Sequence, residues 1–433
     1  MINKLKENIF LKSTIILLIG GVLGKLVGFV LKIIVTRKLG PEGMGIYSML
    51  NPTISLLSVL AVSSYPTAIS KIISEKSSNT KTLFLSIIPV SIIINIILII
   101  IVILLSKTLS IALIKTTKLY IPIICISLTM PFISISSIIK GYFWGKQNMF
   151  PYMLSNFIEQ LTRITLISLF INRINEKGII FSICFILIVN IIGEIISQIV
   201  MLNFINKNKF KNLKFKIYKN EIIKIFKITI PATSSKIIGS ISYFLEPIIL
   251  TNILLYMGYN KSYIIYEYGI INAYALSTLL MPQFFIQNMS TSLIPEISKY
   301  FSQNNIKMCK KRIKQVILLS CFIGSISTII ITIFPKLFLN LLYHNTSGIE
   351  YIRLLSPFTV IFYIETPLIN TLQALGKSKN AMKCSIIGSI IRLLTIVIFA
   401  LLKFGIYSYI ISIIINLIIS TYMYYNVTKK VLN

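Results

Sequence analysis

The stretch TLFLSIIPVSIIINIILIIIVILLS, residues 82–106, contains no charged side chain between Lys81 and Lys107. About twenty apolar residues in an α-helix are enough to cross the hydrocarbon core of a bilayer. Apolar blocks of this length recur along the 433-residue chain, of which 55% is hydrophobic and only 13% is charged. Because the apolar residues form blocks and not amphipathic stripes, the sequence predicts an all-α, polytopic membrane protein.

The apolar blocks predict about twelve transmembrane helices. The second and the eighth contain prolines and are expected to be bent. The first is interpreted as an uncleaved span, because Lys25 interrupts it and no small-residue cleavage site follows. The predicted spans are 13–36, 45–71, 82–106, 119–140, 149–171, 179–205, 228–255, 265–297, 313–335, 351–374, 381–402 and 405–425.

The formal net charge of +31 would suggest a nucleic-acid partner in a soluble protein. Here the positive residues lie mainly in loops between apolar blocks, so they are better explained by orientation in a membrane, and no nucleic acid is expected. With the N-terminus in the cytoplasm, the inside segments hold 27 Lys and Arg residues and the outside loops hold 11. The positive-inside rule therefore favours both termini in the cytoplasm of a bacterial cytoplasmic (inner) membrane.

The two halves of the chain contain similar motifs in the same order. The sequence SYPTAISK at Ser64–Lys71 ends the second span, and SLIPEISK at Ser292–Lys299 ends the eighth. The fifth and eleventh spans each hold one arginine, Arg163 and Arg392. The shared order predicts six spans repeated as six, in two lobes related by a pseudo-twofold axis along the membrane normal. The other echoes are Pro131-Phe132 with Pro357-Phe358 and Gly145-Lys146 with Gly376-Lys377.

A basic loop, KNKFKNLKFKIYKNEIIKIFK at residues 207–227, separates the two halves. Its mixture of Lys with Phe, Ile and Tyr is typical of a helix lying on an anionic leaflet, and equally of a solvated linker that obeys the positive-inside rule. We predict an N-lobe over residues 1–205, a cytoplasmic basic linker over 206–227 and a C-lobe over 228–433.

Charged side chains within the spans are the best functional candidates, because each needs a partner, a water-filled cavity or a ligand. Asn190 and Gln198 join them because they extend a polar stripe through Glu194 at successive i+4 positions, which either lines a cavity or bonds helices together. Five basic against four acidic residues fit an anionic head group. The candidates are Lys25, Lys32, Arg163, Lys236, Arg392, Glu159, Glu194, Glu246, Glu365, Asn190 and Gln198.

Lys25 is the most informative of these candidates. At 100° per residue, Gly21 and Gly28 fall on the same face of the first span as Lys25, and Lys32 falls on this face too. Lys25 is expected near mid-membrane, where a lysine should face water or an anion. We interpret Lys25 as a ligand for a pyrophosphate or another acidic group. The alternative is a structural salt bridge, and Lys32 can equally snorkel to the interface.

Glu159 and Arg163 are spaced i, i+4 in the fifth span and can form a neutral structural pair instead of a binding site. No P-loop, HExxH or GxSxG motif occurs, so the sequence does not predict an enzyme. Five cysteines without paired spacing and a single histidine argue against a metal site, and no cofactor is expected. The energy for transport would come from H⁺ or Na⁺, the membrane potential or the substrate gradient.

Three stretches carry a resemblance to a known family. They are Gly20–Phe29 (GGVLGKLVGF), Leu39–Tyr47 (LGPEGMGIY) and Pro66–Lys71 (PTAISK). Together with Met281-Pro282, Ser292–Ser298 and Gly376-Lys377, they resemble the stage V sporulation protein B family. These polysaccharide flippases are related to the lipid II flippases within the multidrug/oligosaccharidyl-lipid/polysaccharide exporter superfamily. The resemblance covers most of the chain.

The resemblance implies a V-shaped pair of six-helix lobes with a central cavity that works by alternating access. The implied function is the flipping of an undecaprenyl-pyrophosphate-linked saccharide, such as a peptidoglycan or spore-cortex precursor for the cell wall. The lipid II flippases carry a functional Arg-x-x-Gly-Phe motif in the first span, which Lys25-x-x-Gly28-Phe29 matches with Lys for Arg. A further arginine of their eighth helix has no counterpart near residues 272–276.

Two other functions remain open. A cation-coupled multidrug antiporter of the same superfamily would need membrane carboxylates. The chain has no Asp and a basic first span, but Glu159 and Glu194 keep this alternative open. The other alternative is a non-transporting membrane scaffold for cell-wall synthesis. The expected partners are an anionic lipid-linked saccharide, membrane lipids and, for a scaffold, cell-wall synthesis proteins.

Overall fold

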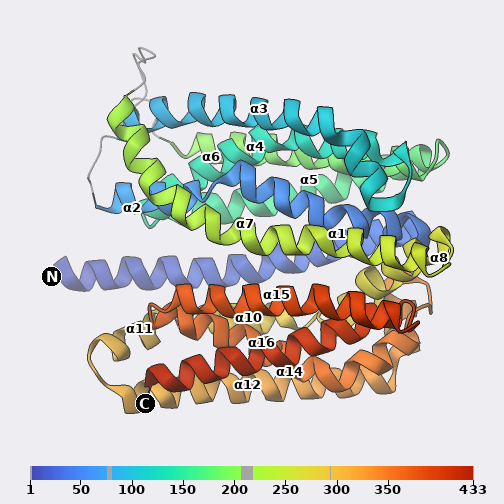
Figure 1. Ribbon diagram of the computed structural model, residues 1–433. Coiled ribbons are helices and arrows are strands. Elements are labelled where there is room, and N and C mark those ends of the chain that lie inside the picture. The colour runs from blue at the N-terminus through green and yellow to red at the C-terminus, as the bar shows by residue number, and fades with distance from the viewer. Residues whose placement is uncertain (1, 76–79, 206–217, 293, 433) are drawn as a thin grey trace. The chain divides into compact units, whose positions relative to one another are not determined.

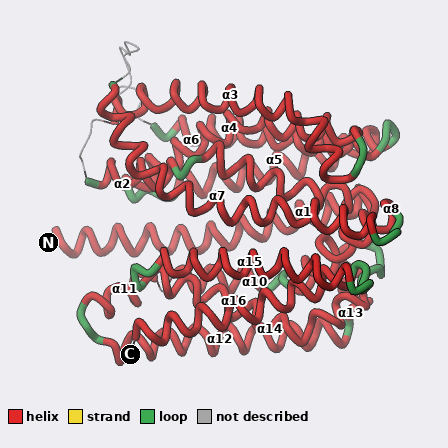
Figure 2. The backbone as a smooth tube through the Cα atoms, viewed as in Figure 1, coloured by secondary structure: helices red, strands yellow, loops and turns green. Residues whose placement is uncertain are grey.

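The computed structural model describes residues 2–75, 80–205, 218–292 and 294–432. These residues form helices joined by short turns and loops, and no strand occurs among them (Figure 2). The chain divides into two compact units. The N-unit contains the residues up to Leu39 and Leu50–Ser240, and the C-unit contains Gly40–Met49 and the chain from Ile241 onward.

The division lies within helices and not in the basic loop. Helix α7 (Lys219–Tyr256) begins inside the predicted linker and runs across Ser240 from one unit into the next (Figure 1). Residues 206–217, most of that linker, lie outside the described residues. The prediction that this segment lies on the membrane surface therefore stays a prediction.

The first two predicted spans belong to one long element, α1 (Ile2–Val62), which contains a break at Gly40. Gly40 has φ 65° and ψ −176°, a backbone conformation that strains any residue with a Cβ atom. The ten residues Gly40–Met49 pack with the C-unit, where a Cβ atom on Gly45 would lie 2.2 Å from the carbonyl oxygen of Ile265. Glycine is thus required for the close approach of this segment to α8 (Lys261–Gly269).

The N-unit is organised around α4 (Tyr120–Gly145), which packs against α2 (Tyr65–Ser74), α3 (Thr80–Ile114) and α6 (Ile179–Asn203). Helix α5 (Phe150–Asn175) packs against α6, and the short helix η1 (Thr117–Leu119) joins α3 to α4. The core between α2, α3 and α4 contains Tyr65, Ile69 and Tyr142, all almost fully buried.

The C-unit repeats this packing order around α14 (Ile349–Ala374), which contacts α10, α11, α12 and α16, while α15 packs against α16. Helices α10 and α11 carry the second copy of the repeated motif, so they correspond to α2. The same neighbours in the same order support the predicted repeat of six spans. The remaining elements are η3 (Ile270–Ala275), α9 (Leu276–Leu279), α10 (Gln283–Ser292), α11 (Ile294–Ser302), α12 (Ile306–Ile333), α13 (Pro335–Tyr343), α15 (Ser378–Leu401) and α16 (Tyr407–Leu432).

Nine helical segments of the described residues are long and apolar enough to cross a membrane. One of them, Leu23–Ser74, covers residues 23–36 of the first predicted span and the whole of the second within 52 residues. A helix pair bent by 59°, Lys261–Leu279 with Gln283–Ser302, corresponds to the eighth predicted span. The charged helix α5 corresponds to the fifth. The prediction of an all-α, multi-pass membrane protein is confirmed, with nine candidate spans, or ten with the bent pair, in the described part of the chain.

Candidate functional site

The N-unit holds one arginine between two glutamates. The Nη2 atom of Arg163, on α5, lies 2.6 Å from Oε1 of Glu159 and 3.7 Å from Oε1 of Glu194, on α6. The side chains of Glu159 and Glu194 are only 6% and 9% exposed, so both carboxylates are inside the protein. Three of the predicted site residues therefore come together. The two carboxylates also lie close enough to repel each other.

This cluster contains one more carboxylate than its arginine can balance. The Oε2 atom of Glu194 is buried and accepts no hydrogen bond within the described part of the chain. Lys140, on α4, adds an attraction to Glu159 that is weaker than that of Arg163. A buried carboxylate oxygen without a donor is unfavourable, and such groups commonly mark a binding site for a proton or a cation.

Gly193 makes room for Arg163. A Cβ atom at this position would lie 2.8 Å from Nε and 3.1 Å from Cγ of Arg163. The other two members of the predicted polar stripe, Asn190 and Gln198, lie in different environments. Gln198 donates from Nε2 to the carbonyl oxygen of Phe132, at 2.7 Å, and so joins α6 to α4. Asn190 is half-buried.

Helix α1 runs alongside α5 in the same direction. A Cβ atom on Gly20 would overlap Met153, and one on Gly24 would lie 3.3 Å from Nδ2 of Asn156. Farther along both helices, Nζ of Lys38 donates to Asn172 at 2.9 Å. Because both helices rise equally per residue, this register places Lys25 at the level of residues just before Glu159 on α5.

The basic face of α1 is open beside Gly28. A Cβ atom at Gly28 would meet no other heavy atom within 4 Å, apart from its own helix backbone. Lys25 is half-buried and Lys32 is exposed. The structure therefore leaves space beside Gly28, on the face that it shares with the two lysines, whereas the glycines that contact α5 are Gly20 and Gly24.

The C-unit holds a second arginine cluster, with a different composition. Nε of Arg392, on α15, lies 2.9 Å from Oε2 of Glu246, on α7, and its Nη2 donates to Oε1 at 3.0 Å. The same Nη2 lies 3.4 Å from the hydroxyl of Tyr409, which donates to Asn272 at 3.1 Å. The side chain of Glu246 is 2% exposed. One carboxylate thus balances one guanidinium at two points, a geometry that suits arginine.

The remaining candidates of the C-unit lie in different surroundings. Glu365 accepts a hydrogen bond of 2.8 Å from Ser420 and is also attracted by the charge of Arg392. Gly388, one turn before Arg392, allows a close approach to α16, since a Cβ atom there would lie 2.6 Å from Oδ1 of Asn416. The candidate Lys236 lies instead in the N-unit part of α7 and is exposed.

Three residues of the C-unit cluster are absent from the predicted candidates. Tyr409 and Tyr268 have ring centroids 5.1 Å apart, and Tyr409 also lies under the Arg392 guanidinium, 5.6 Å from its centre. Asn272 lies in η3, a π-helical turn, a local irregularity that is often found at functional sites. Nothing in the sequence around Asn272 indicates a π-helical turn, and tyrosines are common in spans. Only the charges of Arg392 and Glu246 point to this region.

The described residues contain no group of three or more His, Cys, Asp or Glu side chains that could hold a metal ion. The candidate residues of the spans offer ammonium, guanidinium, carboxylate and amide groups, with hydroxyl groups beside them. These groups bind anions, cations and saccharide hydroxyls by charge and hydrogen bonding.

Comparison with known families gives two matches. The model for polysaccharide biosynthesis proteins matches residues 10–301, and the MatE model matches residues 247–398. The chain is 28% identical to stage V sporulation protein B of Bacillus subtilis (strain 168), over 98% of this chain and 84% of that protein. It is 20% identical to the lipid II flippase MurJ of the same organism, over 88% of this chain and 76% of that protein.

Solved structures show the same fold. A multidrug resistance MATE family transporter of the MOP superfamily, in an inward-facing conformation, superimposes with a TM-score of 0.75 at 15% identity, over 94% of both chains. A MOP superfamily transporter from Pyrococcus furiosus superimposes with a TM-score of 0.64 at 16% identity, over 97% of this chain and 95% of that one. The resemblance predicted from the sequence is confirmed, and the chain belongs to the polysaccharide biosynthesis protein family.

Proposed function

We propose that this protein is a flippase that moves an undecaprenyl-pyrophosphate-linked saccharide across the bacterial cytoplasmic membrane by alternating access. Membership of the polysaccharide biosynthesis family supports this proposal, as does similarity to a lipid II flippase along most of the chain. The observation that carries it is the open, basic face of α1, where Lys25 and Lys32 lie beside the space at Gly28.

The lysines of α1 are suited to hold the pyrophosphate. Arg163 and Arg392 each contact a carboxylate, which fits a role in holding helices together. An ammonium on a flexible stem can follow a phosphate through a conformational change, because its charge does not depend on a planar, bidentate geometry. Lys25 and Lys32 would therefore attract the head group, while the two arginine clusters hold their helices together.

The uncompensated carboxylate of the N-unit supports a role in energy coupling. In this proposal Glu194 exchanges H⁺ or Na⁺ with the aqueous phases, while Arg163 stays paired with the neighbouring Glu159. A charge within a span is costly in free energy. Binding of a cation to the Glu194 carboxylate therefore changes the free energy of the surrounding helices. No resident cofactor is part of this proposal.

The direct test is flipping of labelled lipid-linked precursors in proteoliposomes. We expect the double variant Lys25→Gln/Lys32→Gln to flip the precursor at least about tenfold more slowly. Lys403→Gln, which changes an exposed lysine in a loop, should keep the wild-type rate. The variant Lys25→Arg/Lys32→Arg should retain most of the activity. Wild-type rates in the double glutamine variant would remove both lysines from the site.

A cation-coupled multidrug antiporter remains the second candidate, because the MatE model matches residues 247–398 and MATE transporters share the fold. Drug efflux measured in the same proteoliposomes separates the two functions. Efflux of cationic drugs without flipping of precursors would establish the antiporter. Movement of neither class of substrate would favour a scaffold for cell-wall synthesis proteins.

The orientation is part of the proposal. The excess of Lys and Arg in the even-numbered loops supports cytoplasmic termini. A reporter enzyme fused after Lys216 should therefore report the cytoplasm. An external signal from that fusion would reverse the assignment of the two sides.

A further inference from the structure

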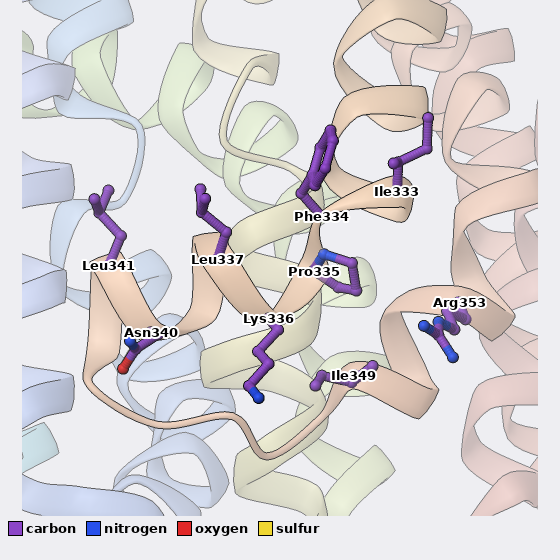
Figure 3. Close-up of a pocket in the computed structure, with 9 residues that line it drawn as sticks. All are labelled: Ile333, Phe334, Pro335, Lys336, Leu337, Asn340, Leu341, Ile349 and Arg353. Atoms are coloured by element: carbon purple, nitrogen blue, oxygen red, sulfur yellow. The ribbon is translucent and has the colours of Figure 1, made fainter.

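A pocket of about 590 Å³ lies in the C-unit where α12, α13 and α14 meet. Lys336 and Arg353 line it from two different helices, together with Asn340. Figure 3 shows the side chains of Leu337 and Leu341 on one side of α13 and that of Lys336 on the other. The pocket therefore has a cationic, polar part and an apolar part.

The short helix α13 has the pattern of a helix that lies in a membrane interface. One face is buried and contains Leu339, Leu342 and Tyr343. Of the side chains that remain outside, Leu337 and Leu341 are 58% and 63% exposed, which is unfavourable in water but expected against lipid. A helix with an apolar and a basic exposed face lies at the level of the lipid head groups.

Neither Lys336 nor Arg353 has an ion-pair partner in the described part of the chain, and both side chains are exposed. They differ in this respect from Arg163 and Arg392. Both also lie on the side that the positive-inside rule places outside, where only 11 of the chain's Lys and Arg residues are found. Two cations in one pocket on that side are explained by an anionic ligand.

A second depression lies next to the pocket, along the membrane-spanning part of α12 and α14. This depression, of about 370 Å³, shares Ile333 with the first and is lined further along by Ile329, Thr332 and Val360. The basic residues of the pocket correspond to the head group of a lipid, and the mainly apolar depression next to it corresponds to the hydrocarbon chain. A soluble anion would use only the pocket.

We propose that this pocket is a binding site for a lipid with an anionic phosphate head group, outside the residues assigned to transport. The phosphate lies between the Lys336 ammonium and the Arg353 guanidinium, which can offer two parallel N–H donors. One hydrocarbon chain follows Phe334 and Ile333 into the depression between α12 and α14. Basic pockets between transmembrane helices bind anionic head groups in this way.

Two sources supply this chemistry, a bulk phospholipid and a polyprenyl phosphate. Native mass spectrometry of the purified protein separates them, with phosphatidylglycerol and undecaprenyl phosphate as probes and phosphatidylcholine as the neutral reference. We expect Lys336→Gln/Arg353→Gln to retain the anionic lipid about thirtyfold more weakly than wild type. Lys403→Gln, which removes one exposed charge from a different outside loop, should bind like wild type.

The charge-conserving variant Lys336→Arg/Arg353→Lys should keep the lipid, which separates loss of charge from loss of folding. Size-exclusion chromatography and thermal unfolding check that each variant is folded. Retention of phosphatidylglycerol supports a bulk lipid as the source, and retention of undecaprenyl phosphate alone supports the transported class. Equal retention by wild type and the double glutamine variant would overturn the proposal. Equal retention of phosphatidylcholine by wild type, or no retention of any probe, would overturn it as well.

Lipid retention is measured without transport. Loss of flipping in the α1 variants and loss of lipid in the α13 and α14 variants can therefore occur separately, and one proposal can fail while the other holds.

Discussion

Arg163 and Arg392 occupy corresponding helices of the two repeats, yet they are balanced in different ways. In the N-unit, Arg163 contacts two carboxylates, one on its own helix and one on α6. In the C-unit, Arg392 contacts one carboxylate, on α7, at two points. The repeat thus keeps the position of the cation and changes the number and origin of the anions.

The difference separates stability from function. In the Arg392–Glu246 pair one negative charge balances one positive charge, and we call such a pair closed. Tyr409 and Asn272 extend the pair by hydrogen bonds, so that it joins α7, α15, α16 and η3. The Arg163 cluster has a surplus carboxylate with a buried, unbonded oxygen. A closed pair has nothing left to exchange with the solvent, whereas a surplus carboxylate can accept a proton or a cation. The units should therefore respond differently to loss of a carboxylate.

The largest effect is expected for Glu246→Gln. It leaves the Arg392 guanidinium inside the C-unit without the carboxylate that contacts it in the described part of the chain, which should lower the free energy of unfolding by about 3–5 kcal/mol. Thermal unfolding in detergent measures the loss. The double variant Glu246→Gln/Arg392→Gln should recover most of it, because no unbalanced charge then remains. A single variant as stable as wild type would show that the pair is not a closed structural unit.

Next in size is Gly193→Ala in the N-unit. The new Cβ atom would lie 2.8 Å from Nε of Arg163, a mid-chain atom that cannot move without shifting the whole side chain. We expect a loss of roughly 1–3 kcal/mol, despite the better helix propensity of alanine. Gly28→Ala is the matched control, since its Cβ atom meets nothing within 4 Å and its stability should rise or stay unchanged. Equal effects of both substitutions would contradict the close packing at Gly193.

The sequence predicted the parts of this comparison that depend on local spacing. Glu159 and Arg163 are one helical turn apart, so their pairing follows from the helix period, and it was an open alternative to a binding role. The Arg392–Glu246 pair joins residues 146 positions apart, and no local pattern indicates it. The apolar blocks predicted an all-helical, multi-pass protein correctly, because length and hydropathy are local properties. The assignment of residues 40–49 to the C-unit depends on tertiary packing at Gly45, which the sequence does not reveal.

The polar stripe of α6 shows the same limit. Asn190, Glu194 and Gln198 share a helix face by spacing, but each finds a different environment. Gln198 donates a hydrogen bond to a backbone carbonyl of α4. This contact depends on how α4 and α6 pack against each other. Spacing predicts which residues face the same way, and the neighbouring helix decides what each of them binds.

Tyr409→Phe should have a moderate effect on the C-unit. It removes a hydroxyl that donates to Asn272 and lies 3.4 Å from Nη2 of Arg392, while it keeps the ring under the guanidinium. The expected loss is about 1 kcal/mol, the usual net value of a hydrogen bond. It should appear in thermal unfolding and be absent from the Asn272→Ala background, where the acceptor is already missing. Additive losses in the double variant would mean that the two side chains act independently.

The smallest effect on stability, and the most informative, is expected for Glu194→Gln. Arg163 keeps Glu159 at 2.6 Å, and removal of one of two mutually repelling carboxylates should change the free energy of unfolding by less than about 1 kcal/mol. If Glu194 exchanges the coupling ion, the variant should still flip precursor down a substrate gradient but no longer respond to an imposed H⁺ or Na⁺ gradient in proteoliposomes. Glu365→Gln, which removes a C-unit carboxylate bonded to Ser420, should keep that response. An unchanged response of Glu194→Gln to both gradients would show that the surplus carboxylate of the N-unit is structural. The difference between the two arginine clusters would then reflect packing alone.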